Sequence, residues 1–160
     1  MVKSVKAILI GLTLTLGACG SGSGGGNVNK FVGVWSPTAG TFTFTCAGQP
    51  TTSQASGNVV WTAGTTSDLV QTIPDTQCVF HADVTGTTAS GVPGQTCIVN
   101  TNTGGDSITD QLSFIAYTFS LSADGLTATE NYSGNDAKTD NTTGASENCT
   151  FTQQASYSKQ

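Results

Sequence analysis

The residues that could support catalysis are few, and their spacing does not favour it. His81 is the only histidine in the chain, so any Ser-His-Asp arrangement would need it as the base. Asp83 follows two residues later, so its side chain and that of His81 would lie on the same face of a strand. A His and an Asp two residues apart are common by chance. The chain has no Gly-x-Ser-x-Gly sequence, in which a sharp turn presents a nucleophilic serine. We therefore predict that the protein is not an enzyme.

The carboxylates offer no clear acid-base pair. Asp124, Asp136 and Asp140 lie in or beside turn sequences. Glu130 differs, because it shares the parity of Ala128 and would point inward near the end of a strand. Its position alone assigns it no role.

A metal site is also not expected. No two cysteines have the Cys-x-x-Cys spacing, and His81 has no histidine partner. Residues 131–148 are rich in Asn and Asp, but they lack the ordered Asp-x-Asp-x-Asp-Gly spacing of a calcium loop. We predict an ordinary solvated loop there, and neither a metal nor another cofactor.

Cys19 stands apart from the other cysteines, at the end of a signal sequence. Lys3 and Lys6 precede a short apolar run over residues 7–16, which is typical of a secretory signal and too short to span a membrane. The run ends in Leu16-Gly17-Ala18-Cys19, which resembles the lipobox of bacterial lipoproteins. The resemblance implies that residues 1–18 are removed and that the Cys19 thiol carries the lipid anchor. An ordinary signal cut after Ala18, leaving a free cysteine, is the alternative.

The residues after the lipobox suggest a location. Gly20 follows Cys19, whereas an Asp there would favour retention in the inner membrane of enteric bacteria. The resemblance therefore implies an outer-membrane lipoprotein of the cell envelope, facing the periplasm or the cell surface. Residues 19–29, with their Gly and Ser, read as a flexible tether to the membrane.

Residues 30–160 are long enough for one domain with a modest core. This part contains ten acidic residues but only three lysines, Lys30, Lys138 and Lys159, and the chain has no arginine. This composition argues against nucleic-acid binding, since too few cations are present to neutralise phosphates.

The four cysteines of the domain suggest two disulfides. Cys46, Cys78, Cys97 and Cys149 each fall on the more apolar face of an alternating segment, and an exported chain meets an oxidising environment. Four cysteines allow three pairings. If sequential hairpins form a closed meander, Cys78 pairs with Cys97 and Cys46 with Cys149, and we favour that pairing.

Alternation with a period of two dominates the domain and predicts an all-β fold. We expect an antiparallel meander of about eight to nine short strands, closed as a barrel or packed as a β-sandwich. The segment around Phe114-Ile115 is apolar on both faces, so its strand is either buried on both sides or carries a bulge. Cys46 followed by Trp61 would suit an immunoglobulin-like sandwich, but the tyrosine corner is missing.

Gly33-x-Trp35 opens the domain and resembles the first-strand signature of lipocalin-like barrels. The resemblance covers about five residues, and it implies that Trp35 plugs one end of the barrel beneath a basic residue from the last strand. Arginine is usual there, and only Lys159 is available. The alternative is a tryptophan that simply serves the core. A lipocalin-like barrel is the architecture that we favour.

The interior of such a barrel holds either packed side chains or one small ligand. We predict a binding module for a small apolar ligand or for an envelope partner, attached to the membrane through Cys19. A structural envelope protein without a ligand is the alternative. The candidate lining residues are the large side chains that alternation along the strands would point inward: Trp35, Phe42, Phe44, Trp61, Phe80, Phe114, Tyr117 and Phe119.

Overall fold

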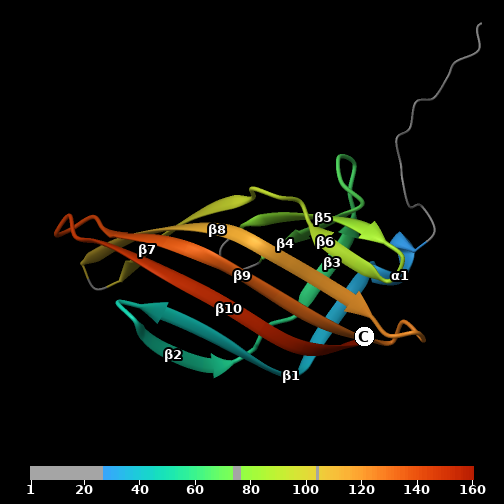
Figure 1. Cartoon of the computed structure of the whole chain (residues 1–160). Coiled ribbons are helices and arrows are strands. Elements are labelled where there is room, and N and C mark those ends of the chain that lie inside the picture. Colours follow the sequence, from blue (N-terminus) through green and yellow to red (C-terminus); the bar gives the residue numbers. More distant parts are fainter. Residues whose placement is uncertain (1–26, 74–76, 104) are drawn as a thin grey trace, which may run out of the picture.

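The computed structural model describes residues 27–73, 77–103 and 105–160. The expected signal sequence, Cys19 and most of the expected tether lie outside the described residues. Within these ranges, a single short helix, α1 (Val28–Phe31), precedes ten antiparallel strands that form one sheet (Figure 1). The strands are β1 (Gly33–Cys46), β2 (Gln49–Gln54), β3 (Val59–Ala63), β4 (Leu69–Thr72), β5 (Val79–Thr85), β6 (Thr88–Gly91), β7 (Thr96–Thr103), β8 (Asp106–Leu121), β9 (Thr127–Asp140) and β10 (Ser146–Lys159).

The sheet closes on itself, which confirms the antiparallel all-β meander. Hydrogen-bonded neighbours run in the order β10-β9-β8-β6-β5-β4-β3-β1, and β1 pairs again with β10. The remaining two strands extend this ring. β2 pairs with the second half of β1, beyond the part that pairs with β3, and β7 pairs with the first half of β8.

Ten strands form instead of eight or nine because two long strands are interrupted. β2 and β3 follow one another along β1, and β6 and β7 follow one another along β8. The breaks fall at residues 55–58 and 92–95, where Gly57 and Gly94 adopt φ values of +88° and +77°. Side chains other than glycine rarely adopt this conformation.

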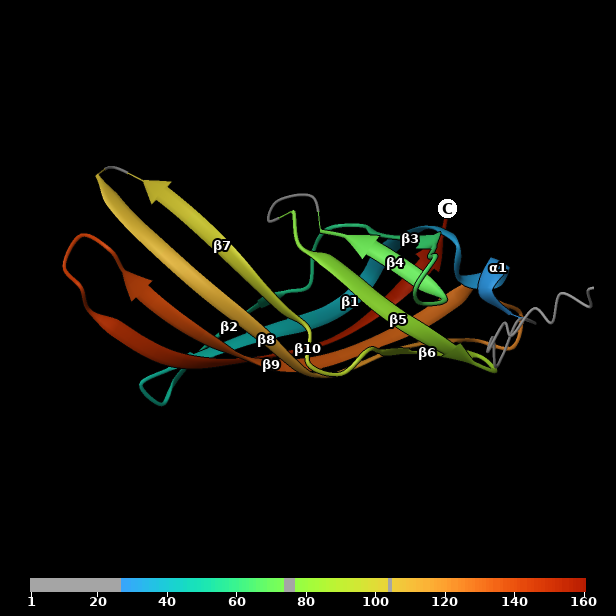
Figure 2. The ribbon, with the colours of Figure 1, turned by 90° about the horizontal axis from the view of Figure 1, so that it is seen from above.

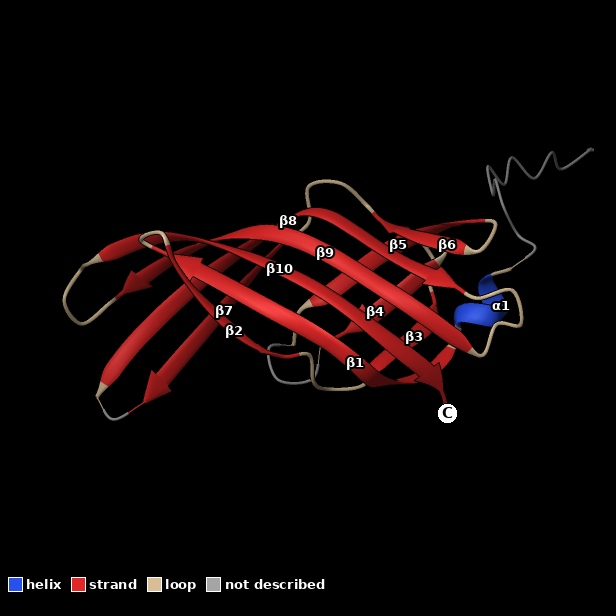
Figure 3. Ribbon diagram, turned by 60° about the horizontal axis from the view of Figure 1, so that its bottom comes forward, coloured by secondary structure: helices blue, strands red, loops and turns tan. Residues whose placement is uncertain are grey.

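The two ends of the molecule differ. β4 and β5 have 4 and 7 residues, whereas β1, β8, β9 and β10 have 14 to 16. The ring is therefore complete only near α1. The long strands continue beyond it as an open curved sheet edged by β2 and β7 (Figures 2 and 3).

The closed end holds the largest fully buried aromatic side chains. Trp35, Trp61 and Phe119 have no exposed surface there, and Phe31 of α1 is equally buried. Trp35 Nε1 donates a hydrogen bond to the Phe31 carbonyl at 2.8 Å, and the Phe119 ring meets the Trp35 ring edge-on at 5.2 Å. The helix thus caps the closed end with an aromatic plug.

Lys159 covers this plug from the last strand. Its Nζ lies 5.3 Å from the centre of the Trp35 ring and donates a hydrogen bond to the Lys30 carbonyl at 2.5 Å. A cation over a tryptophan face is attracted by the negative face of the ring. Lys159 therefore occupies the position that the Gly33-x-Trp35 resemblance assigns to a basic residue.

Both disulfides are present. Cys46 and Cys149 are directly opposite one another on β1 and β10, with Cα atoms 4.4 Å apart. Cys78, just before β5, is bonded to Cys97 on β7. The first bond therefore fastens the open sheet, and the second ties β7 to the shorter side of the ring.

Residues 131–148, which we expected to form a solvated loop, form the end of the β9–β10 hairpin that contains its turn. Only 141–145 connect the two strands. The expectation was wrong because it relied on the polar composition. β9 pairs with β8 on one side and β10 on the other, so its backbone hydrogen bonds are satisfied without an apolar sequence.

Candidate aromatic cavity

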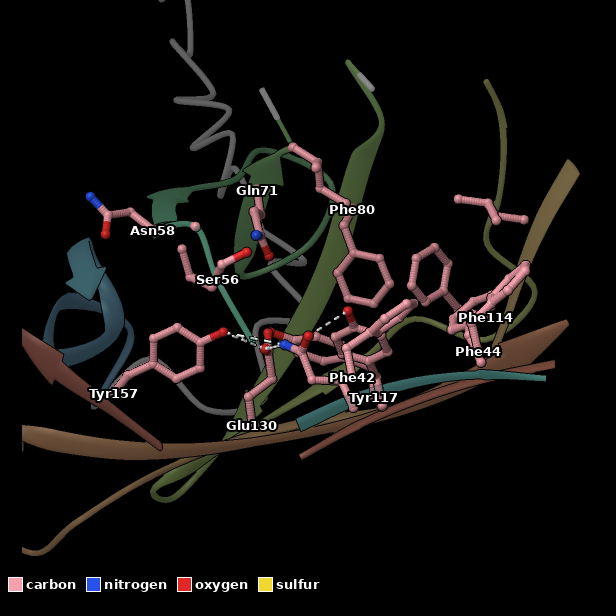
Figure 4. A pocket seen from close by; sticks show the side chains of 17 residues that line it. Phe42, Phe44, Ser56, Asn58, Gln71, Phe80, Phe114, Tyr117, Glu130 and Tyr157 are labelled. Carbon is pink, nitrogen blue, oxygen red and sulfur yellow. Dashed lines mark hydrogen bonds between the residues drawn. The ribbon is translucent and has the colours of Figure 1, made fainter. Parts of the chain in front are cut away.

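A cavity of about 430 Å³ lies where the closed ring gives way to the open sheet (Figure 4). β1, β8, β9 and β10 supply its floor, and β5 contributes one wall through Phe80. The break between β2 and β3 places Ser56 and Asn58 among the lining residues. The interrupted strand and the short β4–β5 hairpin thus leave the interior accessible at this point.

Aromatic residues are the largest group among the residues that line the cavity. Phe114 is central, with ring-centre distances of 5.0 Å to Phe80, 5.5 Å to Phe151 and 6.1 Å to Tyr132. Phe42 extends this group, 6.5 Å from Phe151. Phe42, Phe114 and Tyr132 are only partly buried, so the rings are packed on one side and accessible on the other.

A bulge in β8 directs two of these rings inward. The pairing of β8 with β9 shifts between Phe114 and Ala116, and Ile115 is 67 % exposed on the outer face. Without the bulge, Phe114 and Tyr117 would fall on opposite faces, because their spacing is odd. From the sequence, this strand was expected either to be buried on both sides or to carry a bulge, and the structure has the bulge. The bulge lets both Phe114 and Tyr117 line the cavity.

A glycine on β9 makes room for one of the rings. Gly134 lies opposite Phe151 in the β9–β10 pairing. A Cβ atom at Gly134 would collide with the Phe151 ring and with the Ser113 carbonyl. The Phe151 ring therefore rests directly on the β9 backbone.

A carboxylate lies at the bottom of the cavity. Glu130 is only 2 % exposed, and it accepts hydrogen bonds from Tyr117 Oη at 2.6 Å, Gln153 Nε2 at 2.6 Å and Tyr157 Oη at 2.8 Å. Tyr132 Oη in turn donates to Gln153 Oε1 at 3.0 Å. Figure 4 shows Glu130 between Tyr157 and the phenylalanine rings.

Burial controls the titration of this cluster. It raises the pKa of Glu130, and the hydrogen bonds from Tyr117, Tyr157 and Gln153 oppose that rise only in part. The pKa of Tyr117 is raised well above its usual value, first by burial and then by the negative charge of Glu130. Among the described residues that line the cavity, none is a lysine, an arginine or a histidine.

The structure separates the predicted lining residues into two groups. Five of them line the cavity: Phe42, Phe44, Phe80, Phe114 and Tyr117. The other three, Trp35, Trp61 and Phe119, belong to the packed core of the closed end. These three do not line the cavity, because the ring is complete around them and the interior is filled by their own side chains.

Several cavity residues were not selected from the sequence as ligand-lining. Tyr132, Phe151, Gln153 and Tyr157 complete the walls, together with Glu130. Alternation placed most of these side chains inward, but it cannot tell a packed interior from an open one.

His81 and the cysteines, which were weighed for catalysis and metal binding, lie outside the cavity. His81 Nδ1 is 3.0 Å from Ser67 Oγ, and neither residue lines the cavity. Cys46, Glu147 and Cys149 bring their side-chain ligand atoms within 4.8 Å of one another. The two sulfurs are joined as a disulfide, so they cannot bind a metal as thiolates.

Comparison of the chain with known proteins found no matching family model, no similar curated protein and no similar solved structure. Within the described residues, no helix is long and apolar enough to cross a membrane. The fold and cavity define the class of the described domain: a disulfide-bonded, all-β domain with a ring-closed sheet and an aromatic cavity at its open side.

Proposed function

We propose that the protein is an exported bacterial lipoprotein whose β-domain binds a small, largely apolar molecule in the aromatic cavity. The signal sequence and the lipobox ending at Cys19 support the export and the anchor. The cavity supports the binding function. The observation that carries the proposal is that a group of aromatic rings is partly exposed around about 430 Å³ of space instead of filling it.

The size and composition of the cavity suit such a ligand. Small-molecule sites typically occupy roughly 300–1,000 Å³ and combine apolar walls with a few fixed polar groups. Here phenylalanine rings form the walls, while Glu130, Gln153 and Tyr157 supply the polar groups. A ligand that covers the partly exposed rings would remove apolar surface from water, which stabilises the complex.

Binding can be tested with N-phenyl-1-naphthylamine, a neutral apolar dye whose fluorescence rises in apolar sites. We expect a saturable titration with one dye per chain. In Phe44→Ala, the dye should bind roughly tenfold more weakly, because one aromatic wall of the cavity is lost. Ile115→Ala is the matched control, since Ile115 is an exposed apolar residue on the outer face. Equal affinities in the two variants would contradict the proposal.

The second candidate is a structural or surface envelope protein without a ligand. In the described part of the chain, β2 and β7 each pair on one side only, so the open sheet has two free edges that a partner could extend. A flat dye titration would favour this candidate.

The lipid anchor is tested separately. Cells grown with an alkyne-labelled fatty acid should incorporate the label into the wild-type protein, and Cys19→Ser should lose it, because the thioether requires the thiol. Label retained by Cys19→Ser would exclude this anchor. A Cys97→Ser control would show whether loss of any cysteine has the same effect.

A further inference from the structure

We infer that the cavity selects a ligand with a protonated amine on an apolar body, an inference that rests on the proposed binding function. The argument starts from the carboxylate at the bottom of the cavity and from the rings above it.

Glu130 has one acceptor direction to spare. Its Oε2 accepts hydrogen bonds from Gln153 and Tyr157, whereas its Oε1 accepts only one, from Tyr117. A carboxylate has about four lone-pair directions in total. A ligand N–H group could therefore donate to Oε1 without displacing an existing partner.

No protein cation balances the charge of Glu130 within the described cavity lining. Lys159 Nζ donates a hydrogen bond to the backbone carbonyl of Lys30 at the α1 end, and Lys138 is half-buried near the end of β9. None of these three lysines lines the cavity. The titratable groups that face Glu130 are Tyr117, Tyr132 and Tyr157. A buried carboxylate without a counter-charge is costly, and a cationic ligand would supply the missing partner.

The surrounding rings favour the same ligand. Phe42, Phe80 and Phe114 line the cavity together with Tyr132 and Phe151. Aromatic faces carry negative electrostatic potential, so groups of rings attract ammonium ions while also accommodating an apolar chain. An anionic ligand of equal size would instead be repelled by Glu130.

Three probes with the same apolar chain test the inference: n-octylammonium, n-octanol and n-octanoate. We would titrate each into the wild-type protein by isothermal calorimetry at about pH 8, where the amine remains charged. Octylammonium should bind at least about tenfold more tightly than octanol, and octanoate should bind most weakly. Octanol binding as tightly as octylammonium would overturn the inference while leaving the proposed binding function intact.

The variant Glu130→Gln identifies the responsible group. It should bring the affinities of octylammonium and octanol close together, whereas Glu147→Gln, which changes an exposed residue, should leave the wild-type ranking unchanged. A preference for octylammonium that survives in folded Glu130→Gln would contradict the assigned role. If that variant does not fold, the ranking in the wild-type protein still decides the inference. Failure of all three probes and of the neutral dye to bind would contradict the proposed function itself.

Discussion

At the residue scale, Glu130 is under two opposing influences. Burial disfavours its charged form and raises its pKa, while three donors favour the charged form. Asp136, further along β9, is also only 2 % exposed, and its Oδ1 has no hydrogen-bond partner among the described residues. Its pKa is raised too, mainly by burial and then by Asp110.

The raised pKa of Glu130 predicts how stability depends on pH. Between the unfolded value near 4.5 and the higher folded value, the folded state binds more protons than the unfolded state. The free energy of unfolding should therefore fall as the pH rises through this window. We expect urea unfolding of Glu130→Gln to show a smaller fall, with a remainder from Asp136.

Glu147→Gln serves as the comparison, because Glu147 is exposed on the same hairpin. It should keep the wild-type dependence on pH. A Glu130→Gln protein with the full wild-type fall would show that Glu130 titrates normally and isn't desolvated.

At the element scale, the alternation of the sequence predicted where the strands lie and that the sheet closes. It predicted the lengths of the strands less well. Phe42, Phe80 and Phe114 point inward as expected. Glycines mark the breaks in the strands, but the side-chain hydrogen bonds that replace missing strand pairing come from residues distant in the sequence and show in no local pattern. At the second break, Gln95 Oε1 accepts a hydrogen bond from the His81 N–H at 2.6 Å, and Gln95 Nε2 donates to the His81 carbonyl at 2.9 Å, as a strand residue would.

The cavity could not be predicted from alternation for the same reason. Trp61 and Phe44 both have inward parity, yet Trp61 is fully buried and Phe44 is partly exposed in the cavity. The difference lies in what covers them. The ring is complete around Trp61. Phe44 lies in the second half of β1, which pairs with β2 and extends beyond the short strands β3 and β4, so these strands do not cover it.

The two disulfides should differ in their contributions to stability. Cys46–Cys149 closes 103 residues and Cys78–Cys97 closes 19. In the chain-entropy account, a loop of about 100 residues contributes roughly 4.7 kcal/mol and one of about 15 residues roughly 3 kcal/mol. We expect the Cys46→Ala/Cys149→Ala protein to lose more stability in urea unfolding than the Cys78→Ala/Cys97→Ala protein. The reverse order would show that native-state contacts, not loop length, set the difference.

At the scale of the whole molecule, the chain combines a rigid closed end with an open side. α1 and the Trp35 plug seal one end of the ring, and Lys159 covers that plug. The long strands extend beyond the ring on the other side (Figure 2), and they carry most of the residues that line the aromatic cavity. In the proposed function, the closed end provides the stability that allows apolar rings to remain accessible in the cavity.

The most direct test of the binding cavity is to map a bound ligand by NMR, using backbone amide and aromatic side-chain signals with and without the neutral dye N-phenyl-1-naphthylamine. The account predicts the largest shifts at Phe44, Phe114 and Phe151, with small changes at Trp35 in the sealed end. Shifts confined to the edges at β2 and β7, or no saturable shifts at all, would contradict it.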